Sequence, residues 1–398
     1  MKNSIINHEG GDEAGSIMML AGEKSGDDYG AKIATQLIKM SGDNRKIFGT
    51  GGNAMARAGV KLIYHIKDLA YLGYWEPLKD IFVIRKKINR LKQEFIYRKP
   101  KLVILIDYPG FNLYFAKFIK RNTNTKIIYY IPPTIWAWKE NRIAKLKKYI
   151  DHLIVIFPFE RSYYQKHHVA VNFFGHPLYG ELANFKKDRQ KFCDSNRLDP
   201  SIKIISIMLG SRNTLFKSLA PIAYDLIKKI NAKHINYVFV LCLSDSLADD
   251  LAQKWRHNFS NLAGVIFESN ASQALLNADL CLCNSGTTAL EATLLQTPAF
   301  FYIKIAPISA FIVRLFFKKP WFSITNFILQ RKAMLEFVQE DCTVDNILPA
   351  IHKFFADQDF RYDYMKQLSE VKQKMHYSID HYRAVTYFIL STTKERAS

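Results

Sequence analysis

The segment Ser285-Gly-Thr-Thr-Ala-Leu-Glu291, within CNSGTTALEATLLQTPAFFYIK (283–304), is the most informative stretch for the fold. The apolar residues before it, 280–283, are typical of the end of a buried strand, and the pattern of 289–295 is typical of a helix. Small hydroxyl and glycine residues stand between them. The segment therefore predicts a strand that turns tightly into a helix, the repeating unit of a parallel sheet covered by helices.

This turn has the composition of a phosphate site. A helix N-terminus at Gly286 offers free backbone N–H groups and the positive end of the helix dipole to an anion. Ser285, Thr287 and Thr288 add hydroxyl donors suited to a diphosphate, and Glu291 is an acceptor suited to two sugar hydroxyls. We interpret the segment as a nucleotide-sugar site. The simpler alternative is that a Ser or Thr merely caps the helix.

Apolar runs of strand length alternate with helical patterns along the chain, in two series. The runs are 17–20, 102–107, 126–131 and 153–157, then 204–208, 237–242, 280–283 and 299–303. Continuous apolar strands between helices predict parallel sheets buried on both faces. We therefore expect an α/β protein of two doubly wound domains, with ligands at the carboxyl ends of the strands. The expected domains are 1–183 and 184–365, followed by a helical segment, 366–398, that packs back on the first domain of its own or a partner chain.

The composition narrows the class of partner. A length of 398 residues suits two domains, and a formal net charge of +20 implies an anionic partner. Lys and Arg are scattered beside aromatic residues, without a basic tail or a nucleic-acid-binding motif, which favours a membrane surface over nucleic acid. The five cysteines include only a C-x-C pair, Cys281 and Cys283. Buried thiols in a reducing compartment are therefore expected rather than a zinc site.

The chain has no obvious membrane-crossing segment. Its beginning, MKNSIINHEGGDEAG, lacks the apolar core of a signal peptide, and the apolar stretch 299–317 is interrupted by Lys304, Pro307 and Arg314. We expect a cytoplasmic protein that touches a membrane from outside.

Two strand ends in the first half carry carboxylates. Glu23 lies in AGEKSGD (21–27), directly after the first strand, and Asp107 ends the LVILID strand. A carboxylate at that edge of a sheet is where a general base belongs. Pairing with a helix dipole explains Asp27 adequately, and helix capping is the alternative for Asp107. The glycines at 49–52 lack the spacing of a dinucleotide-binding loop.

Gly210-Ser211-Arg212 follows the first strand of the second half. A permanently charged guanidinium beside a glycine turn suits phosphate oxygens, although a surface arginine is the alternative. An aromatic and aliphatic stretch at 71–84, which runs into lysines and arginines, fits either an acyl-chain or membrane site or an amphipathic core helix. His176, in GHPL, is equally compatible with a structural and a catalytic role.

Taken together, these segments resemble the lipid-A-disaccharide synthase family of GT-B glycosyltransferases. The matching motifs occur in the family's order over nearly the whole chain. They are AGEKSGD (21–27), GGNAMARAG (51–59), LGYWE (72–76), IDYPGFN (106–112), IPPTIWAWKENR (131–142), FPFE (157–160), FGHPL (174–178), LGSR (209–212), SGTTALE (285–291) and TNFILQRKAMLEFVQE (325–340).

The resemblance implies a GT-B fold with a cleft between its domains and an inverting reaction without cofactor or metal. In that reaction, 2,3-diacylglucosamine passes from UDP to the 6-hydroxyl of 2,3-diacylglucosamine 1-phosphate on the anionic cytoplasmic face of an inner membrane. A second copy of the chain is a candidate partner. The residues that the resemblance implies as catalytic are Asp107, Glu23, Arg212 and Asn326. Those implied in UDP binding are Gly210, Ser211, Arg212, Ser285, Gly286, Thr287, Thr288, Glu291, Gln339 and Glu340, and those facing acyl chains or membrane are Tyr74, Trp75, Leu78, Ile81 and Phe82.

Several positions depart from the family pattern. Leu209 stands where the family usually has Pro, Leu215 where it has Glu, and Gly110 where it often has Asp. Pro132 and Thr134 replace serines. The change at Leu215 removes a polar contact expected near the nucleotide and keeps two other interpretations open. These are a scaffold that only binds lipid or nucleotide, and another UDP-sugar enzyme such as a UDP-N-acetylglucosamine epimerase or a lipid-II-type transferase.

Overall fold

The computed structural model describes most of the chain. Its described residues are 15–41, 46–69, 81–136, 142–183, 185–233, 237–244, 247–284, 286–307, 309–310 and 319–394, and for 81–84 it describes the backbone alone.

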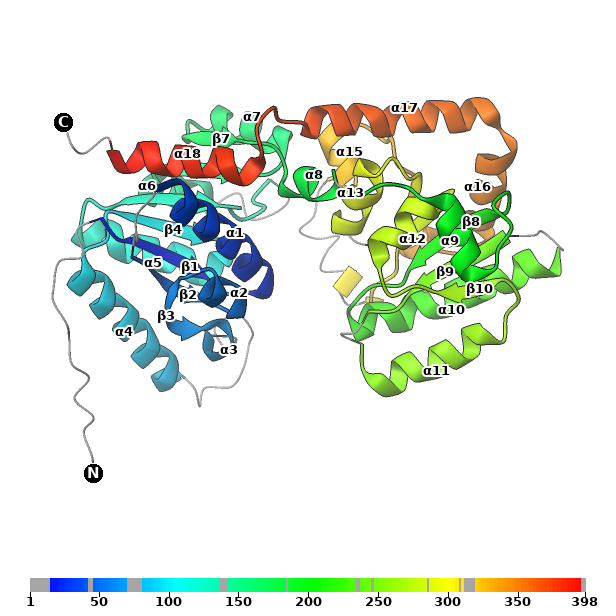
Figure 1. Cartoon of the computed structure of the whole chain (residues 1–398), viewed down its shortest axis with the longest axis horizontal. Helices are drawn as coiled ribbons and strands as arrows, with labels where there is room; N and C mark the ends of the chain where they lie inside the picture. The colour runs from blue at the N-terminus through cyan, green and yellow to red at the C-terminus, as the bar shows by residue number, and fades with distance from the viewer. Residues whose placement is uncertain are drawn as a thin grey trace. The chain divides into compact units, whose positions relative to one another are not determined.

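The chain folds into two compact units (Figure 1). Unit 1 comprises Met1–Pro177 together with Tyr377–Ser398, and unit 2 comprises Leu178–His376. The C-terminal helix thus returns to the unit that contains the N-terminus. The functions that we assign to the two domains stay predictions.

Unit 1 contains a seven-stranded parallel sheet of order β3-β2-β1-β4-β5-β6-β7. Because the chain runs outward from β1 in one direction and then resumes at β4 on the other side, β1 and β4 form the switch point at which such sheets bind ligands. Its strands are β1 Ile17–Ala21, β2 Ile47–Gly51, β3 Lys61–His65, β4 Leu102–Ile106, β5 Lys126–Tyr130, β6 His152–Val155 and β7 Val171–Phe173.

Unit 2 repeats this plan with a six-stranded parallel sheet of order β10-β9-β8-β11-β12-β13. Its switch point lies between β8 and β11. The strands are β8 Lys203–Met208, β9 Tyr237–Cys242, β10 Val265–Phe267, β11 Leu280–Cys283, β12 Ala299–Ile303 and β13 Glu336–Val338. Each of the eight apolar runs expected to be strands coincides with a strand of one sheet, and the predicted α/β class is confirmed.

Helices connect the strands and cover both faces of each sheet. In chain order they are α1 Lys24–Ser41, α2 Asn53–Arg57, α3 Ile66–Leu69, α4 Ile81–Arg98, α5 Pro109–Asn122, α6 Ile143–Tyr149, α7 Pro158–Lys166, α8 Pro177–Leu182, α9 Arg189–Asn196, α10 Asn213–Ala232, α11 Asp249–Ser260, α12 Ala271–Asn277, α13 Gly286–Leu294, α15 Ile324–Leu329, the 3-10 turn η4 Gln339–Asp341, α16 Val344–Ala356, α17 Gln358–Met375 and α18 His381–Lys394.

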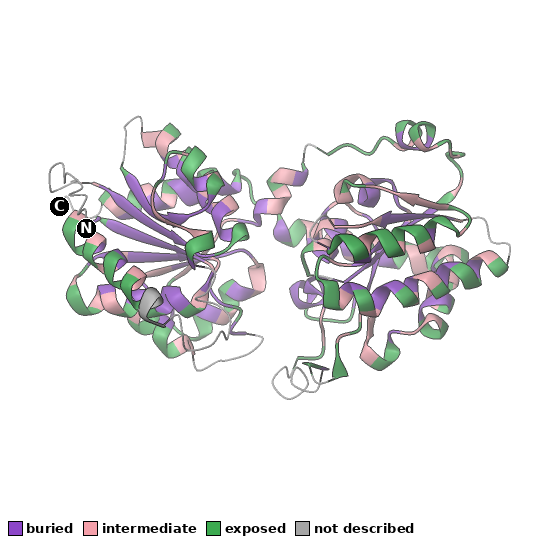
Figure 2. Cartoon of the chain, turned by 90° about the horizontal axis from the view of Figure 1, so that it is seen from below, coloured by how far each residue is buried: buried purple, intermediate pink, exposed green. Residues whose placement is uncertain are grey.

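The strand β4 illustrates why the central strands are continuously apolar. Val103 and Leu105 pack on one side with residues of α4, α5 and α6, whereas Ile104 and Ile106 pack on the other with residues of α1 and α18. All five residues of β4 are buried (Figure 2). Alternate side chains of a strand point to opposite faces, so a strand with two covered faces excludes polar residues.

The C-terminal helix α18 lies against α1 and is anchored in unit 1 by buried polar contacts (Figure 1). The His381 ring shares a hydrogen bond of 2.7 Å with the Tyr130 hydroxyl, and its other nitrogen lies 3.0 Å from the Phe174 carbonyl oxygen. These contacts fix the start of α18 over the carboxyl end of β5.

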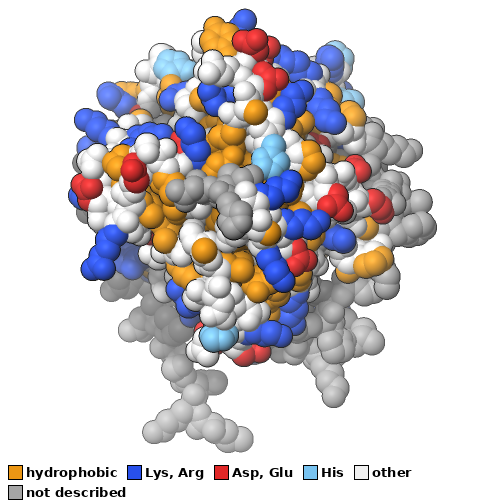
Figure 3. Space-filling model, turned by 90° about the vertical axis from the view of Figure 1, so that its right-hand side faces the viewer, with side chains coloured by type: hydrophobic (Ala, Val, Ile, Leu, Met, Phe, Trp, Pro, Cys, Tyr) orange, Lys and Arg blue, Asp and Glu red, His pale blue; other side chains and the backbone are white. Residues whose placement is uncertain are grey.

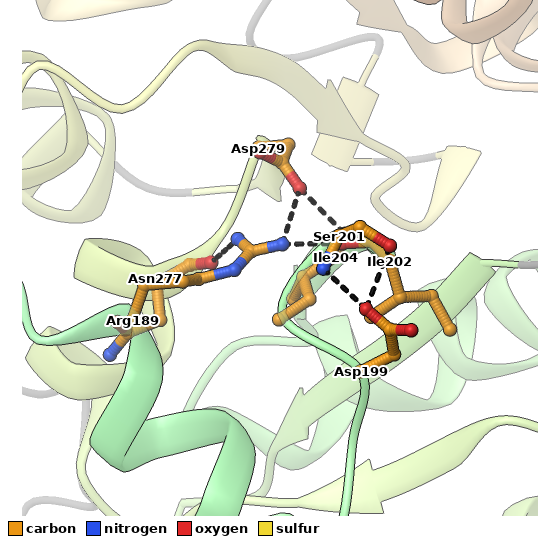
Figure 4. Close-up of polar contacts among 7 residues, drawn as sticks. All are labelled: Arg189, Asp199, Ser201, Ile202, Ile204, Asn277 and Asp279. Atoms are coloured by element: carbon orange, nitrogen blue, oxygen red, sulfur yellow. Dashed lines mark hydrogen bonds and ion pairs between the residues drawn. The ribbon is translucent and has the colours of Figure 1, made fainter.

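The amino ends of β8 and β11 are tied together by a charged network (Figure 4). Arg189 lies 3.1 Å from the Asp279 carboxylate and donates to the Asn277 carbonyl at 2.6 Å. Asp279 also accepts from the Ile204 backbone N–H at 2.8 Å. Because this network lies at the opposite end of the strands from the switch-point loops, its role is structural, and the chemistry has to be sought at the carboxyl edge.

Candidate active site

The carboxyl edge of the second sheet encloses a pocket of about 850 Å³. It lies beyond the ends of β8, β9, β11 and β12, and so spans the switch point. Among the residues that line it are Gly210, Ser211, Arg212, Asn284 and Thr288. The structure thus brings together residues of the two segments that the sequence predicted to bind the nucleotide, LGSR and SGTTALE.

The turn after β8 adopts a left-handed conformation that favours glycine. Gly210 has φ of +87°, and a side chain there would meet Leu215 at 3.0 Å and Asn284 at 3.2 Å. The Asn284 amide donates to the Met208 carbonyl at 2.6 Å, and the Tyr302 hydroxyl donates to the same oxygen at 3.1 Å. Nothing in the sequence motif pointed to Asn284, which fastens the loop after β11 to the end of β8.

The described lining of the pocket is rich in donors. Arg212 stands at the N-cap of α10 and is exposed to the pocket, and the hydroxyl residues Ser211, Ser244 and Thr288 also line it. None of the described lining residues is acidic. Leu215, where the family resemblance anticipates a carboxylate, forms an apolar wall against the glycine turn. This balance favours an anionic ligand.

The remaining residues of SGTTALE are placed differently. Ser285 lies outside the described residues, and Gly286 and Thr287 are exposed at the start of α13. Glu291 lies outside the pocket lining and accepts from the Ser272 hydroxyl at 2.5 Å. Burial raises the pKa of Glu291, and the Ser272 hydrogen bond partly opposes that rise. The predicted contact between Glu291 and sugar hydroxyls stays a prediction.

Gln339 supports the pocket wall from η4. Its side-chain amide accepts from the Ile305 N–H at 2.7 Å and donates to the Ile305 carbonyl at 3.2 Å, and Ile305 lines the pocket. Glu340, its neighbour in η4, is exposed. The structure therefore places Gln339 behind the wall of the pocket.

Asn326 is fully buried in α15, and its side chain is occupied by internal hydrogen bonds. Its amide oxygen accepts from the N–H groups of Ala333 and Met334, both at 2.7 Å. Its amide nitrogen donates to the Glu336 carboxylate at 2.7 Å and to the Met334 carbonyl at 3.0 Å. The position suits a residue that holds the segment before β13 in place.

The carboxyl edge of the first sheet carries acids instead. Asp107 follows β4 and Glu23 follows β1, so both stand at the switch point of unit 1. They are close enough to interact, because the negative charge of Glu23 contributes to raising the pKa of Asp107. Burial is the larger cause of that rise, and the Tyr108 backbone N–H opposes it. The sequence predicted each carboxylate separately at a strand end, and their proximity is a finding of the structure.

The backbone at Asp107 is firmly held. Asp107 and Tyr108 both have left-handed φ angles, 45° and 49°. The Asp107 carbonyl accepts from the Asn112 amide at 2.6 Å and from the Tyr129 hydroxyl at 2.8 Å. The N-cap of α5 is Tyr108 and no side chain caps this helix, so helix capping does not explain Asp107. A strained backbone that the surroundings hold in place is a common property of catalytic loops.

Asp27, by contrast, is a structural residue. Its buried carboxylate accepts from the backbone N–H groups of Gly52, Ala54 and Met55 at 2.7, 3.1 and 2.9 Å. It thereby satisfies the N-terminus of α2. A side chain at Gly52 would come within 2.5 Å of this carboxylate, which explains the glycine in GGNAMARAG.

Two further motifs of unit 1 are explained by buried contacts. Glu160 accepts from the Trp136 indole N–H at 2.8 Å and from the Phe157 N–H at 3.1 Å. Burial raises the pKa of Glu160 to about 7, against the effect of these hydrogen bonds. His176 is buried against the Phe157 ring, and burial, followed by the nearby His381, lowers its pKa to about 3. His176 is therefore neutral at physiological pH.

Other predicted features lie partly outside the described residues. Tyr74, Trp75 and Leu78 are outside them, as are the side chains of Ile81 and Phe82. Of the helices in the described ranges, none is long and apolar enough to span a bilayer. On the face drawn in Figure 3, Lys and Arg side chains are spread among hydrophobic ones. Cys281 and Cys283 are buried free thiols, as expected.

Comparison with known proteins identifies the family. A family model described as lipid-A-disaccharide synthetase matches residues 17–387. The lipid-A-disaccharide synthase of Coxiella burnetii (strain Dugway 5J108-111) is 34% identical over 360 residues, which cover 90% of this chain and 94% of the relative.

Solved structures of GT-B architecture share the fold at low sequence identity. MurG of Acinetobacter baumannii is 12% identical with a TM-score of 0.59, covering 95% of this chain and 99% of its own. A UDP-N-acetylglucosamine 2-epimerase, so described, from Listeria monocytogenes is 9% identical with a TM-score of 0.63, covering 96% of each chain. Because a transferase and an epimerase both share the architecture, these two structures establish the fold and leave the reaction to the site residues.

Proposed function

The chain belongs to the lipid-A-disaccharide synthetase family, and from this premise we propose that it joins two acylated sugars into the lipid A disaccharide. The donor is UDP-2,3-diacylglucosamine and the acceptor is 2,3-diacylglucosamine 1-phosphate. The acceptor 6-hydroxyl displaces UDP from the anomeric carbon of the donor. The products are the β(1→6) disaccharide 1-phosphate and UDP.

One observation supports this reaction most directly: the two switch points carry opposite chemistry. The pocket of unit 2 offers Arg212 and hydroxyl donors, with no acid among its described lining residues, which suits the diphosphate of a nucleotide sugar. The switch point of unit 1 offers Asp107 and Glu23, which suits a sugar hydroxyl that must lose a proton. A transfer between sugars needs both.

Asp107 acts as the general base in this mechanism. Its carboxylate takes the proton of the acceptor 6-hydroxyl as that oxygen attacks the anomeric carbon from the face opposite to UDP, so the configuration inverts. The raised pKa of Asp107 makes it a stronger base than an exposed aspartate. Glu23 orients a sugar hydroxyl and keeps the site negatively charged.

Unit 2 stabilises the departing UDP. Negative charge grows on the diphosphate as the bond to the anomeric carbon breaks. We assign its stabilisation to Arg212 and Thr288, which line the pocket, and to Ser285, which lies outside the described residues. Preorganised donors of this kind lower the barrier electrostatically. We assign this stabilisation to protein groups and not to a metal ion.

Two residues act indirectly, by holding parts of the protein around the pocket in place. Asn326 fixes the segment before β13, and Gln339 fixes Ile305 in the pocket wall. Both are positioning residues in this mechanism. Their loss would change the shape of the pocket rather than remove a group that touches the substrate.

The substrates also account for the charge of the chain. Both are anionic and carry acyl chains held in a bilayer, so a chain of net charge +20 suits a peripheral enzyme on the anionic cytoplasmic face of an inner membrane. The residues around Tyr74 and Trp75, with Leu78, Ile81 and Phe82, are assigned to acyl chains. A homodimer remains a candidate assembly.

The deciding experiment incubates the protein with UDP-2,3-diacylglucosamine and 2,3-diacylglucosamine 1-phosphate. We expect UDP release that depends on the acceptor and matches disaccharide formation mole for mole. Binding of UDP without turnover would indicate a binding protein instead, and turnover of soluble UDP-N-acetylglucosamine alone would indicate an epimerase.

A further inference from the structure

A pocket of unit 1, of about 270 Å³, lies between α5 and α6. The α5 residues that line it recur at intervals of three and four, which places them on one helix face. They are Pro109, Gly110, Leu113, Tyr114 and Lys117; Arg142, Lys145 and Tyr149 line the pocket from α6 and its N-cap.

Three cations meet in this small space. Lys117, Arg142 and Lys145 all line the pocket, and none of its described lining residues is acidic. Within the described ranges of the chain, none of the three forms an ion pair with a carboxylate. Like charges repel unless an anion lies between them. The neighbouring Lys120 differs, because it pairs with Asp151 at 2.6 Å.

The pocket adjoins the proposed base. Pro109 and Gly110 follow Asp107 directly at the start of α5. The Arg142 guanidinium is near enough to the Tyr129 phenol to oppose slightly the large rise that burial causes in its pKa. The Tyr129 hydroxyl in turn donates to the Asp107 carbonyl at 2.8 Å. The cations therefore stand beside the Asp107 loop without lying in it.

A fourth cation stands at the edge of the pocket. Lys92 of α4 donates to the Tyr114 hydroxyl at 2.9 Å and lies over the Tyr114 ring at 4.9 Å from its centre. This contact holds Tyr114, a wall residue, and extends the positive surface toward α4. Apolar Leu113 and the tyrosine rings line the rest of the pocket, so it suits an anion attached to an amphipathic molecule.

We propose that Lys117, Arg142 and Lys145 bind the phosphomonoester of the acylated acceptor sugar. This assignment rests on the proposed function, in which Asp107 meets the 6-hydroxyl of that sugar. The 6-hydroxyl is carried through C5 and the phosphate by C1, the two carbons that flank the ring oxygen, so the phosphate requires a separate cationic site that directly adjoins the base. The volume, below the range of about 300 to 1,000 Å³ typical of whole small-molecule sites, suits one head group.

The test compares two variants of equal charge. Lys117→Gln with Lys145→Gln removes two pocket cations, and Lys147→Gln with Lys148→Gln removes two exposed cations of α6 that do not line the pocket. Equilibrium binding of 2,3-diacylglucosamine 1-phosphate, and of the same lipid without its phosphate, is measured in neutral detergent micelles. Binding needs no turnover, so it decides the inference even if no disaccharide forms.

We expect the pocket variant to bind the phosphorylated lipid at least about tenfold more weakly, since hydrogen bonds to charged groups are worth about one power of ten each. Its binding of the dephosphorylated lipid and of UDP should be unchanged, and the α6 control should resemble the wild type. Retained preference for the phosphorylated lipid would overturn the inference. The inference would also be overturned if the pocket variant lost only its binding to vesicles of anionic phosphatidylglycerol, because the pocket cations would then contact the membrane surface. If disaccharide formation fails in the wild type while this preference is lost in the variant, only the transferase function is refuted.

Discussion

At the switch point of the first sheet the loops after β1 and β4 present Glu23 and Asp107, whereas at that of the second sheet the loops after β8 and β11 present Arg212, Ser211 and Thr288. The two sheets share parallel strands and the same reversal of strand order. The difference therefore comes from the side chains that each loop carries. Topology decides where a site forms, and the residues decide which part of a reaction it performs.

Asp107→Asn removes the proposed general base at the switch point of unit 1 and should have the largest effect. We expect turnover to fall by about a hundred- to ten-thousandfold, the range for loss of a general base. UDP affinity should be kept, because Asp107 lies in unit 1 and the UDP pocket in unit 2. Steady-state assays of disaccharide formation measure the turnover. The control is Asp28→Asn, at a side chain that is exposed. Activity within a few-fold of wild type would exclude Asp107 as the base.

Asp27→Ala tests the structural role of Asp27, in contrast to the catalytic role that we propose for Asp107 in the same unit. It leaves three backbone N–H groups at the start of α2 without their acceptor. The free energy of unfolding should fall by about 3 kcal/mol, since each buried donor left unpaired is costly. Asp28→Ala, at the exposed neighbouring position, should change it by less than about 0.5 kcal/mol. Urea unfolding compares the two, and equal values would contradict the structural role.

Arg212→Gln tests the cationic pocket at the switch point of unit 2. It removes the only cation among the described lining residues of the unit 2 pocket, so UDP should bind about tenfold more weakly. Lys217→Gln, on an exposed position of α10 outside the pocket lining, is the matched control. If calorimetry gives the same UDP affinity for both variants, Arg212 does not contact the diphosphate.

Glu23→Gln tests the interaction between the two acids of unit 1 through the pH dependence of the reaction rate, and it should have the smallest effect. In the proposed mechanism the carboxylate form of Asp107 is the active one, so we expect activity to be lost as pH falls through its raised pKa. Removing the negative charge of Glu23 lowers that pKa, so the acidic limb of the rate profile should move to lower pH. A limb that stays in place, or moves to higher pH, would show that Glu23 does not act on Asp107.

The sequence predicted the central strands well because both of their faces are buried. Runs such as 102–106 and 237–242 are continuously apolar, and this pattern identifies them. Five strands were not among the predicted runs. The edge strands β3, β7, β10 and β13 consist mostly of half-buried residues. The buried β2 is IFGTG, in which glycine and threonine interrupt the apolar run.

The candidate site was predictable to the extent that it follows strand ends. Glu23, Asp107 and Arg212 were found that way. The partners that hold the loops were not, because they come from distant parts of the chain: Asp27 binds α2, and Gln339 binds Ile305. Local patterns carry no information about such pairings.

Titration of UDP into the Asp107→Asn and Arg212→Gln variants side by side tests the division of roles most directly. We predict that Asp107→Asn binds UDP as tightly as the wild type while forming almost no disaccharide, and that Arg212→Gln binds UDP about tenfold more weakly. Loss of UDP binding in Asp107→Asn, or unchanged binding in Arg212→Gln, would contradict it.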